Sequence, residues 1–171
     1  TRELLNSFHA LVGEEVTNCG GVVTSFMGDG AMILFGLPEP AANDAFNAAR
    51  CCVGLSSRTN DWLASLPAPT ASRLGFKIGA HHGTIVASRL GGEGRQHIAA
   101  TGDTVNVASR LMEIAADQDA EVAVSDKMLQ VAGRDCELFK SGALRGPVET
   151  QIRGRSGSLA IWLWQSAQDA A

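Results

Sequence analysis

Three polar residues of this chain could support chemistry: Asp29, Asn106 and Arg110. Asp29 lies between two glycines and two apolar runs, in the segment SFMGDGAMILFG at residues 25–36. Asn106 and Arg110 lie four residues apart in TGDTVNVASRL, at residues 101–111. A carboxylate can bind a divalent cation, an amide can orient a sugar, and a guanidinium can clamp a phosphoryl group. Each of the three residues also has a purely structural interpretation.

Asp29 has the sequence context of a hairpin turn. Asp-Gly between two apolar runs favours a tight turn, because both residues tolerate positive φ. A hairpin tip also lets a carboxylate project beyond the sheet without being buried. Magnesium in proteins is usually bound by one or two carboxylates together with substrate phosphates. The local pattern therefore leaves both a turn role and a metal-binding role open.

Asn106 and Arg110 are expected on one face of a helix. Asp103 or Thr104 suits the N-cap position, and residues four apart are neighbours on a helix surface. Four apolar residues of this helix can face the core: Val105, Ala108, Leu111 and Met112. Asn106 is then either a residue near the cap or one that orients a sugar. Arg110 is either a solvated surface charge or a clamp for a phosphoryl group, and spacing alone does not choose.

The elements that position these residues follow from the apolar periodicity. A helix is expected over residues 1–20, two strands around Gly28–Gly30, and a second helix over residues 41–66. Strand patterns then flank a Gly-rich segment at residues 91–94, and a strand, a short helix and two closing strands follow the Asn/Arg helix. This order predicts an α+β fold, a ferredoxin-like βαββαβ sandwich with a mostly antiparallel sheet and helices packed on one face.

Composition excludes several classes of protein. The chain has 171 residues, 45% hydrophobic and 19% charged, with a net charge of −4, which is ordinary for one globular domain. It is not basic enough to predict a nucleic-acid partner. No apolar run approaches the roughly 18 residues of a membrane span. The four cysteines form no CxxC pair, so we expect buried free thiols and a cytoplasmic location.

Two segments together resemble the catalytic domain of class III nucleotidyl cyclases, the adenylate/guanylate cyclase family. They are CGGVVTSFMGDGAMILFG and, about seventy residues later, TGDTVNVASRL. The resemblance extends to FKIGAHHGTIVASRLGGEGRQHIAATGD, to the closing QIRGRSGSLAIWLW and to the opening helix. It covers nearly the whole chain, so residues 1–171 are expected to form one cyclase catalytic domain.

The resemblance implies a reaction and a role for each candidate residue. The family converts a nucleoside triphosphate to a 3′,5′-cyclic nucleotide and pyrophosphate, with two divalent ions, Mg²⁺ or Mn²⁺. Asp29 matches the second metal-binding aspartate and Asn106 the asparagine that orients the ribose. Arg110 matches the arginine that stabilises charge on the α-phosphate. Arg153 or Arg155 matches the basic residue that contacts the outer phosphates.

The sequence departs from the family pattern in three places. The family's other metal aspartate lies on a strand before the opening helix, and this sequence does not contain it. In the family this strand lies in the middle of the sheet, and a domain without it would have an unpaired strand edge there. We therefore expect that the sequence is a truncated domain from which the first strand is missing. Ser25 stands where adenylyl enzymes have an adenine-reading lysine. Ala99 stands where its partner Asp or Thr would be, so a preference for ATP over GTP is not predicted.

The family forms its sites at a dimer interface, with metal aspartates from one chain and the Asn/Arg pair from the other. A homodimer with two equivalent sites is therefore implied. The leading interpretation is an active cyclase for intracellular signalling. We expect no membrane segment in this chain, and a location in the cytoplasm as the cytosolic domain of a larger protein. The alternative is a catalytically silent cyclase-homology domain that dimerises or binds nucleotide to regulate an attached module.

Overall fold

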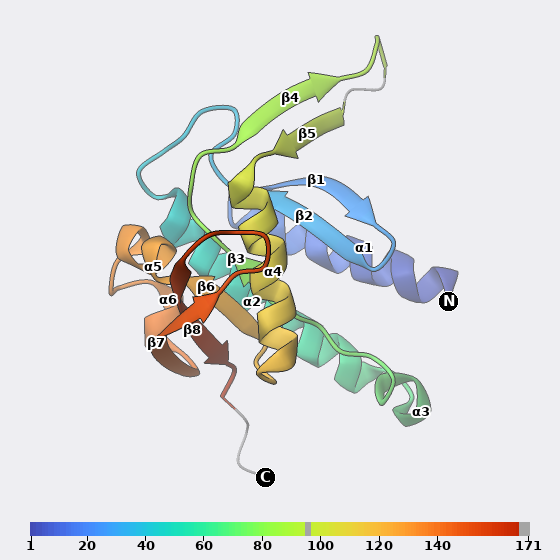
Figure 1. Cartoon of the computed structure of the whole chain (residues 1–171). Coiled ribbons are helices and arrows are strands. Elements are labelled where there is room, and N and C mark those ends of the chain that lie inside the picture. Colours follow the sequence, from blue (N-terminus) through green and yellow to red (C-terminus); the bar gives the residue numbers. More distant parts are fainter. Residues whose placement is uncertain (95–96, 168–171) are drawn as a thin grey trace.

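The computed structural model describes residues 1–94 and 97–167. The helices are α1 (Arg2–Asn18), α2 (Asp44–Ser65), α3 (Ala68–Ala71), α4 (Asp103–Asp117), α5 (Asp126–Ala132) and α6 (Glu137–Lys140). The strands are β1 (Val22–Met27), β2 (Gly30–Leu34), β3 (Ile78–Ala80), β4 (Val86–Leu90), β5 (His97–Thr101), β6 (Val122–Ser125), β7 (Ala143–Gln151) and β8 (Ser158–Gln165). Figure 1 shows their arrangement.

The strands form three sheets in the part of the chain that the structure describes. The largest has four strands in the order β3-β6-β8-β7, in which β3 and β6 are parallel and the other pairs antiparallel. The β1–β2 and β4–β5 hairpins are separate two-stranded antiparallel sheets, and the β4–β5 hairpin projects from the body of the molecule (Figure 1). The predicted α+β class with mostly antiparallel pairing is confirmed.

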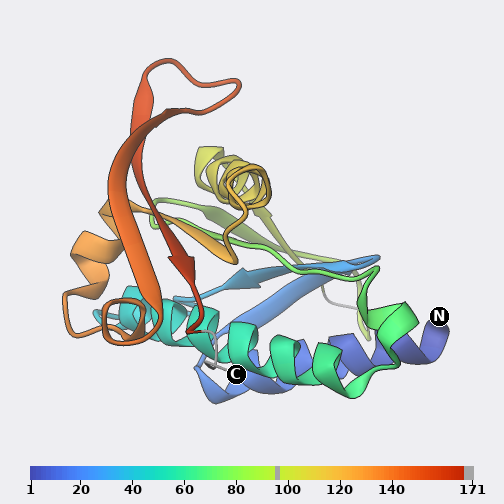
Figure 2. The same cartoon turned by 90° about the horizontal axis from the view of Figure 1, so that it is seen from below.

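Helices cover both faces of the four-stranded sheet, whereas the sequence predicted helices on one face. On one face, α2, α5 and α6 pack over Val122 and Val124 of β6 and Trp164 of β8. On the other face, α4 packs over Ala123 of β6 and Ile161 of β8. The physical reason is that successive strand residues point to opposite faces, and β6 is apolar on both. Figure 2 shows α1 and α2 on one side of the strands and α4 on the other.

Gly79 of β3 allows α4 to lie directly against the sheet. A Cβ atom at this position would collide with the carbonyl oxygen of Ala108 and the backbone nitrogen of Met112. Only a glycine therefore permits this approach of helix backbone to strand. The contact fixes the height of α4 over the sheet, and with it the place of every residue on the outer face of α4.

The first two helices pack against each other below the β1–β2 hairpin. Val12 and Val16 of α1 and Cys51 and Leu55 of α2 are buried together with Cys19. All four cysteines are buried and free, as the sequence predicted. Within the described residues, no helix is both long and apolar enough to cross a bilayer.

Candidate active site

Asp29 lies at the tip of the β1–β2 hairpin, as predicted. Met27 pairs with Gly30, so the two-residue turn consists of Gly28 and Asp29 rather than of Asp29 and Gly30. Gly28 takes a positive φ of 60°. Glycine is the residue type that a hairpin turn favours at its first central position. The Asp29 side chain is exposed. The turn thus relies on Gly28 for its geometry and leaves the carboxylate of Asp29 free for a ligand.

The N-cap of helix α4 lies one or two residues before the expected position. The N-cap residue is Gly102 with a φ of 129°, a backbone conformation that favours glycine. The predicted caps Asp103 and Thr104 are both inside the helix, and the Thr104 hydroxyl donates instead to the carbonyl oxygen of Thr84 at 2.7 Å. This hydrogen bond ties the start of α4 to the segment before β4.

The buried face of α4 also differs in part from the expected one. Its buried residues are Val107, Leu111 and Ala115. Met112, which the sequence placed toward the core, is 44% exposed. The correction leaves the outer face of α4 as predicted: Asn106 is exposed and Arg110 is partly exposed on it.

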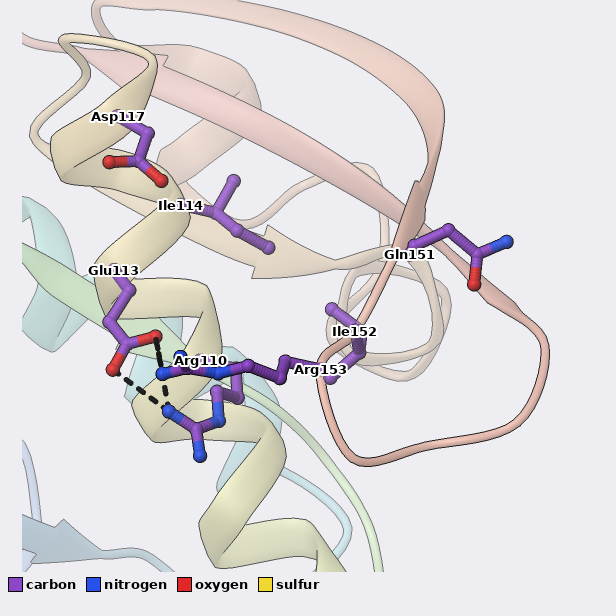
Figure 3. A pocket seen from close by; sticks show the side chains of 7 residues that line it. All are labelled: Arg110, Glu113, Ile114, Asp117, Gln151, Ile152 and Arg153. Carbon is purple, nitrogen blue, oxygen red and sulfur yellow. Dashed lines mark hydrogen bonds and ion pairs between the residues drawn. The ribbon is translucent and has the colours of Figure 1, made fainter.

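Arg110 is held by a carboxylate of its own helix. Its Nη1 donates to Glu113 Oε1 at 3.0 Å and to Glu113 Oε2 at 3.2 Å. Figure 3 shows both guanidinium groups of the site, those of Arg110 and Arg153, turned toward this carboxylate. Arg153 Nη2 lies 3.7 Å from Glu113 Oε2. Glu113 therefore links the helix to the loop between β7 and β8.

The second arginine of this loop contacts a different part of α4. Arg155 Nη1 lies 3.4 Å from Oδ2 of Asp103, in the first turn of the helix. The loop at residues 152–157 thus meets α4 at two points about ten residues apart along it, through opposite charges. These ion pairs are exposed, so each contributes only about 0.2–1 kcal/mol.

A cleft of about 440 Å³ separates α4 from the end of β7. Its lining residues are Arg110, Glu113, Ile114, Asp117, Gln151, Ile152 and Arg153 (Figure 3). The structure therefore brings Arg110 and Arg153 together. Asp29, Asn106 and Arg155 do not line this cleft, and neither do Ser25 and Ala99.

Ser25 and Ala99 lie on two strands that contact each other. Ser25 is on β1 opposite Met32, and Ala99 is on β5 opposite Ser88. β1 and β5 lie side by side in the same chain, and both residues are partly buried. The two positions that the resemblance connects with base recognition are thus carried by neighbouring elements.

Asp29 fits a divalent cation as one ligand among several. Its carboxylate is exposed at the turn, and Mg²⁺ is commonly bound through one or two carboxylates with phosphate oxygens completing the shell. The described residues contain no group of three or more His, Cys, Asp or Glu side chains that could hold a metal.

His81 follows β3 and contacts Ser125 at the end of β6. Its Nδ1 is 2.7 Å from the hydroxyl oxygen of the buried Ser125. Burial is the main cause that lowers the pKa of His81 to about 4, and the positive charges of Lys127 and Arg155 act in the same direction. Asp103 opposes them.

Sequence reasoning missed the carboxylates that contact the arginines. The Arg110–Glu113 pair has a local signal, because residues three apart on a helix are neighbours. The pairs of Arg153 with Glu113 and of Arg155 with Asp103 have none, because the partners are about forty to fifty residues apart in the chain.

The fold is that of nucleotide cyclase catalytic domains. The guanylyl cyclase Cya2 has 23% sequence identity and a TM-score of 0.74, over 98% of this chain and 82% of that one. The non-canonical dimeric guanylyl cyclase domain of the RhoGC fusion protein from Blastocladiella emersonii has 17% identity and a TM-score of 0.67, over 97% of this chain and 84% of that one.

The sequence gives the same family. Residues 1–164 match the Adenylate and Guanylate cyclase catalytic domain, and the chain belongs to this family. Adenylate cyclase 1 of Rhizobium meliloti (strain 1021) is 28% identical over 160 residues, which are 93% of this chain. The chain spans 23% of the length of that relative. The predicted membership of the class III cyclases is confirmed.

Proposed function

We propose that this chain is the catalytic domain of a nucleotidyl cyclase, which converts ATP or GTP to a 3′,5′-cyclic nucleotide and pyrophosphate. The observation that carries this proposal is the meeting of Arg110 and Arg153 at one open cleft, in a chain of the cyclase family. Guanidinium groups bind phosphate oxygens through pairs of parallel hydrogen bonds. Two of them at one cleft suit a polyphosphate.

Each polar residue of the site has a separate role in the proposed reaction. Asn106 orients the ribose so that its 3′-hydroxyl faces the α-phosphate. Arg110 stabilises the negative charge that develops on the α-phosphate in the transition state. Arg153 contacts the outer phosphates, and its place in the cleft beside Arg110 supports this choice over Arg155, which lies at Asp103 instead.

Asp29 would be a ligand of the metal ions. Two divalent ions, Mg²⁺ or Mn²⁺, would supply activation of the attacking hydroxyl and neutralisation of the leaving pyrophosphate when bound. Asp29 contributes one carboxylate ligand from the exposed hairpin tip. Its exposure and the turn geometry set by Gly28 support this role.

The complete site requires a second copy of the chain. Asp29 does not line the cleft of Arg110 and Arg153, so one copy presents the phosphate-binding arginines without the metal ligand. A symmetric homodimer in which Asp29 of one copy faces the cleft of the other has two equivalent sites. The RhoGC cyclase domain, which shares the fold, forms a non-canonical dimer, so it supports dimerisation but not this particular arrangement.

We expect only weak discrimination between ATP and GTP. Neither the Ser25 hydroxyl nor the Ala99 methyl group can replace a lysine and its acceptor, and polar contacts to a base are what produce strong discrimination. These same residues support the rival function, a silent cyclase-homology domain that regulates an attached module. In either case we place the chain in the cytoplasm, as one domain of a longer protein.

The test is a product assay on the protein at its full natural length. ATP and GTP are supplied separately with Mn²⁺ or Mg²⁺, and cyclic nucleotide is measured by chromatography. We expect cyclic product, and Arg110→Ala should lower kcat by at least about 100-fold without a change in thermal stability. Arg134→Ala, an exposed arginine away from the cleft, is the matched control. A folded dimer that makes no product from either nucleotide would favour the silent domain.

A further inference from the structure

His9 of α1 contacts the hairpin tip that carries Asp29. Its Nε2 lies 3.0 Å from the carbonyl oxygen of Gly28, the residue before Asp29. Its ring stacks on the ring of Phe26, with centroids 4.0 Å apart and an interplanar angle of 23°. One side chain therefore contacts both the backbone of the turn and the end of β1.

Helix α1, which carries His9, is held in place by packing against α2. Trp62 of α2 donates from Nε1 to the Ser7 hydroxyl oxygen at 3.1 Å, and its ring packs on Phe8 at a centroid distance of 5.8 Å. Val12 and Val16 are buried one and two turns further along α1. The residues on either side of His9 thus attach α1 to the body of the domain.

The hairpin tip has little other support. Phe26 is 39% exposed and Met27 is 62% exposed, so neither is fixed by the core. Gly28, with its positive φ, adds a residue that loses more conformational freedom on ordering than any other type. A contact from a fixed helix is therefore what reduces the freedom of this turn.

We infer that His9 is a positioning residue, which holds the Gly28–Asp29 turn so that the carboxylate of Asp29 is presented to the metal. This inference rests on the proposed function, in which Asp29 is a metal ligand. The Nε2–H of His9 donates to the Gly28 carbonyl oxygen, and the imidazole ring stacks on Phe26. His9 acts through the turn and does not itself touch the metal or the nucleotide.

The first test measures the turn without any ligand. In the protein at its full natural length, amide hydrogen exchange is followed for the peptide at residues 26–31. His9→Ala should speed this exchange roughly 3- to 10-fold, the effect of losing one hydrogen bond. His9→Gln, which keeps an amide donor, should restore most of the protection, and His9→Phe should restore only the part due to stacking. Ser7→Ala, which removes one contact between α1 and α2 but keeps the contact of His9 with Gly28, should speed the exchange less than His9→Ala does.

The second test measures the metal. Mn²⁺ binding is followed by electron paramagnetic resonance with a non-hydrolysable nucleoside triphosphate present. His9→Ala should weaken Mn²⁺ binding by about the same 3- to 10-fold, and raise the half-saturating Mn²⁺ for turnover in parallel. The KM for the nucleotide at saturating Mn²⁺ should stay unchanged, and His9→Gln should again rescue.

The outcomes separate this inference from the proposed function. Turnover by the unchanged protein, together with exchange and Mn²⁺ dependence that His9→Ala leaves unaltered, would overturn the role of His9 alone. An unchanged protein that makes no cyclic nucleotide would overturn the proposed function. An equal loss in Ser7→Ala and His9→Ala would show that α1 packing matters rather than the contact with Gly28.

Discussion

Glu113 accepts hydrogen bonds from Arg110 through both of its carboxylate oxygens, at 3.0 and 3.2 Å. It draws this arginine toward the C-terminal end of α4, whereas Asn106 lies one turn toward the N-terminal end of the same face. In the proposed function, this carboxylate occupies the guanidinium that would bind a phosphate of the substrate. In the free domain, the negative charge of Glu113 therefore partly balances the positive charges of Arg110 and Arg153.

Glu113→Gln should therefore lower the KM for the nucleotide. The phosphates no longer compete with a carboxylate for Arg110 and Arg153, and an exposed ion pair of about 0.2–1 kcal/mol corresponds to a change of roughly 1.5- to 5-fold. Steady-state kinetics measures KM and kcat. Asp117→Asn, which removes a charge from the same cleft, is the control for general charge effects. A higher KM would mean that Glu113 orients Arg110 rather than competing for it.

Arg153 and Arg155 should separate in a pair of alanine variants. Arg153 lines the cleft, so Arg153→Ala should raise the KM for the nucleotide by about 10-fold or more, the loss of one charge-assisted hydrogen bond. Arg155 pairs with Asp103 outside the cleft, so Arg155→Ala should change KM less than about 2-fold. The reverse order would assign the outer phosphates to Arg155.

Gly79→Ala should destabilise the domain strongly. The added methyl group collides with backbone atoms of Ala108 and Met112, which cannot move without displacing α4. Overpacking of this kind costs about 1–3 kcal/mol or more, as urea denaturation would measure. Gly13→Ala is the opposite control, because nothing lies within 4 Å of its added Cβ atom inside α1. That substitution should stabilise by about 0.5–1 kcal/mol, and a neutral result at Gly79 would contradict the close approach.

His81 should make stability depend on pH. The folded pKa is lowered from 6.5 to about 4 by burial, by Lys127, by Arg155 and by His82, with Asp103 opposing. Between these values the unfolded chain binds a proton that the folded chain does not, so stability falls as the pH is lowered. The contribution is fully present above about pH 6.5 and is lost as the pH approaches about 4.

The measurement is the free energy of unfolding in urea at several pH values in this range. His81→Asn, which does not titrate, should flatten the dependence. His97→Asn, which removes an exposed histidine, should leave it as it is. Equal slopes in all three proteins would exclude His81 as the source.

Local features of the fold are predictable from the sequence because their causes are local. The hairpin at Asp29 follows from two apolar runs and two glycines, and only the turn centre is displaced, because the positive φ falls on Gly28. The shared face of Asn106 and Arg110 follows from helical spacing. The N-cap of α4 is not found, because Gly102 forms it through a backbone φ of 129° rather than a side-chain hydrogen bond.

Other features depend on contacts between distant segments and have no signal in a single sequence. The place of α4 on the second face of the sheet depends on Gly79 meeting Ala108 across space. Which of Arg153 and Arg155 lines the cleft depends on where the β7–β8 loop passes α4. Residue types identify candidates, but the approach of two backbones decides which of them share a cleft.

The buried cysteines make the chain a ready background for site-directed labelling. Burial raises the pKa of Cys52 to about 12 and raises those of Cys19 and Cys51 as well, so the thiolates that alkylating reagents attack are scarce. A cysteine introduced at an exposed position such as Met27 would then be the reactive thiol of the folded domain. A fluorophore or spin label attached there would report the movement of the Asp29 turn without removal of any native cysteine.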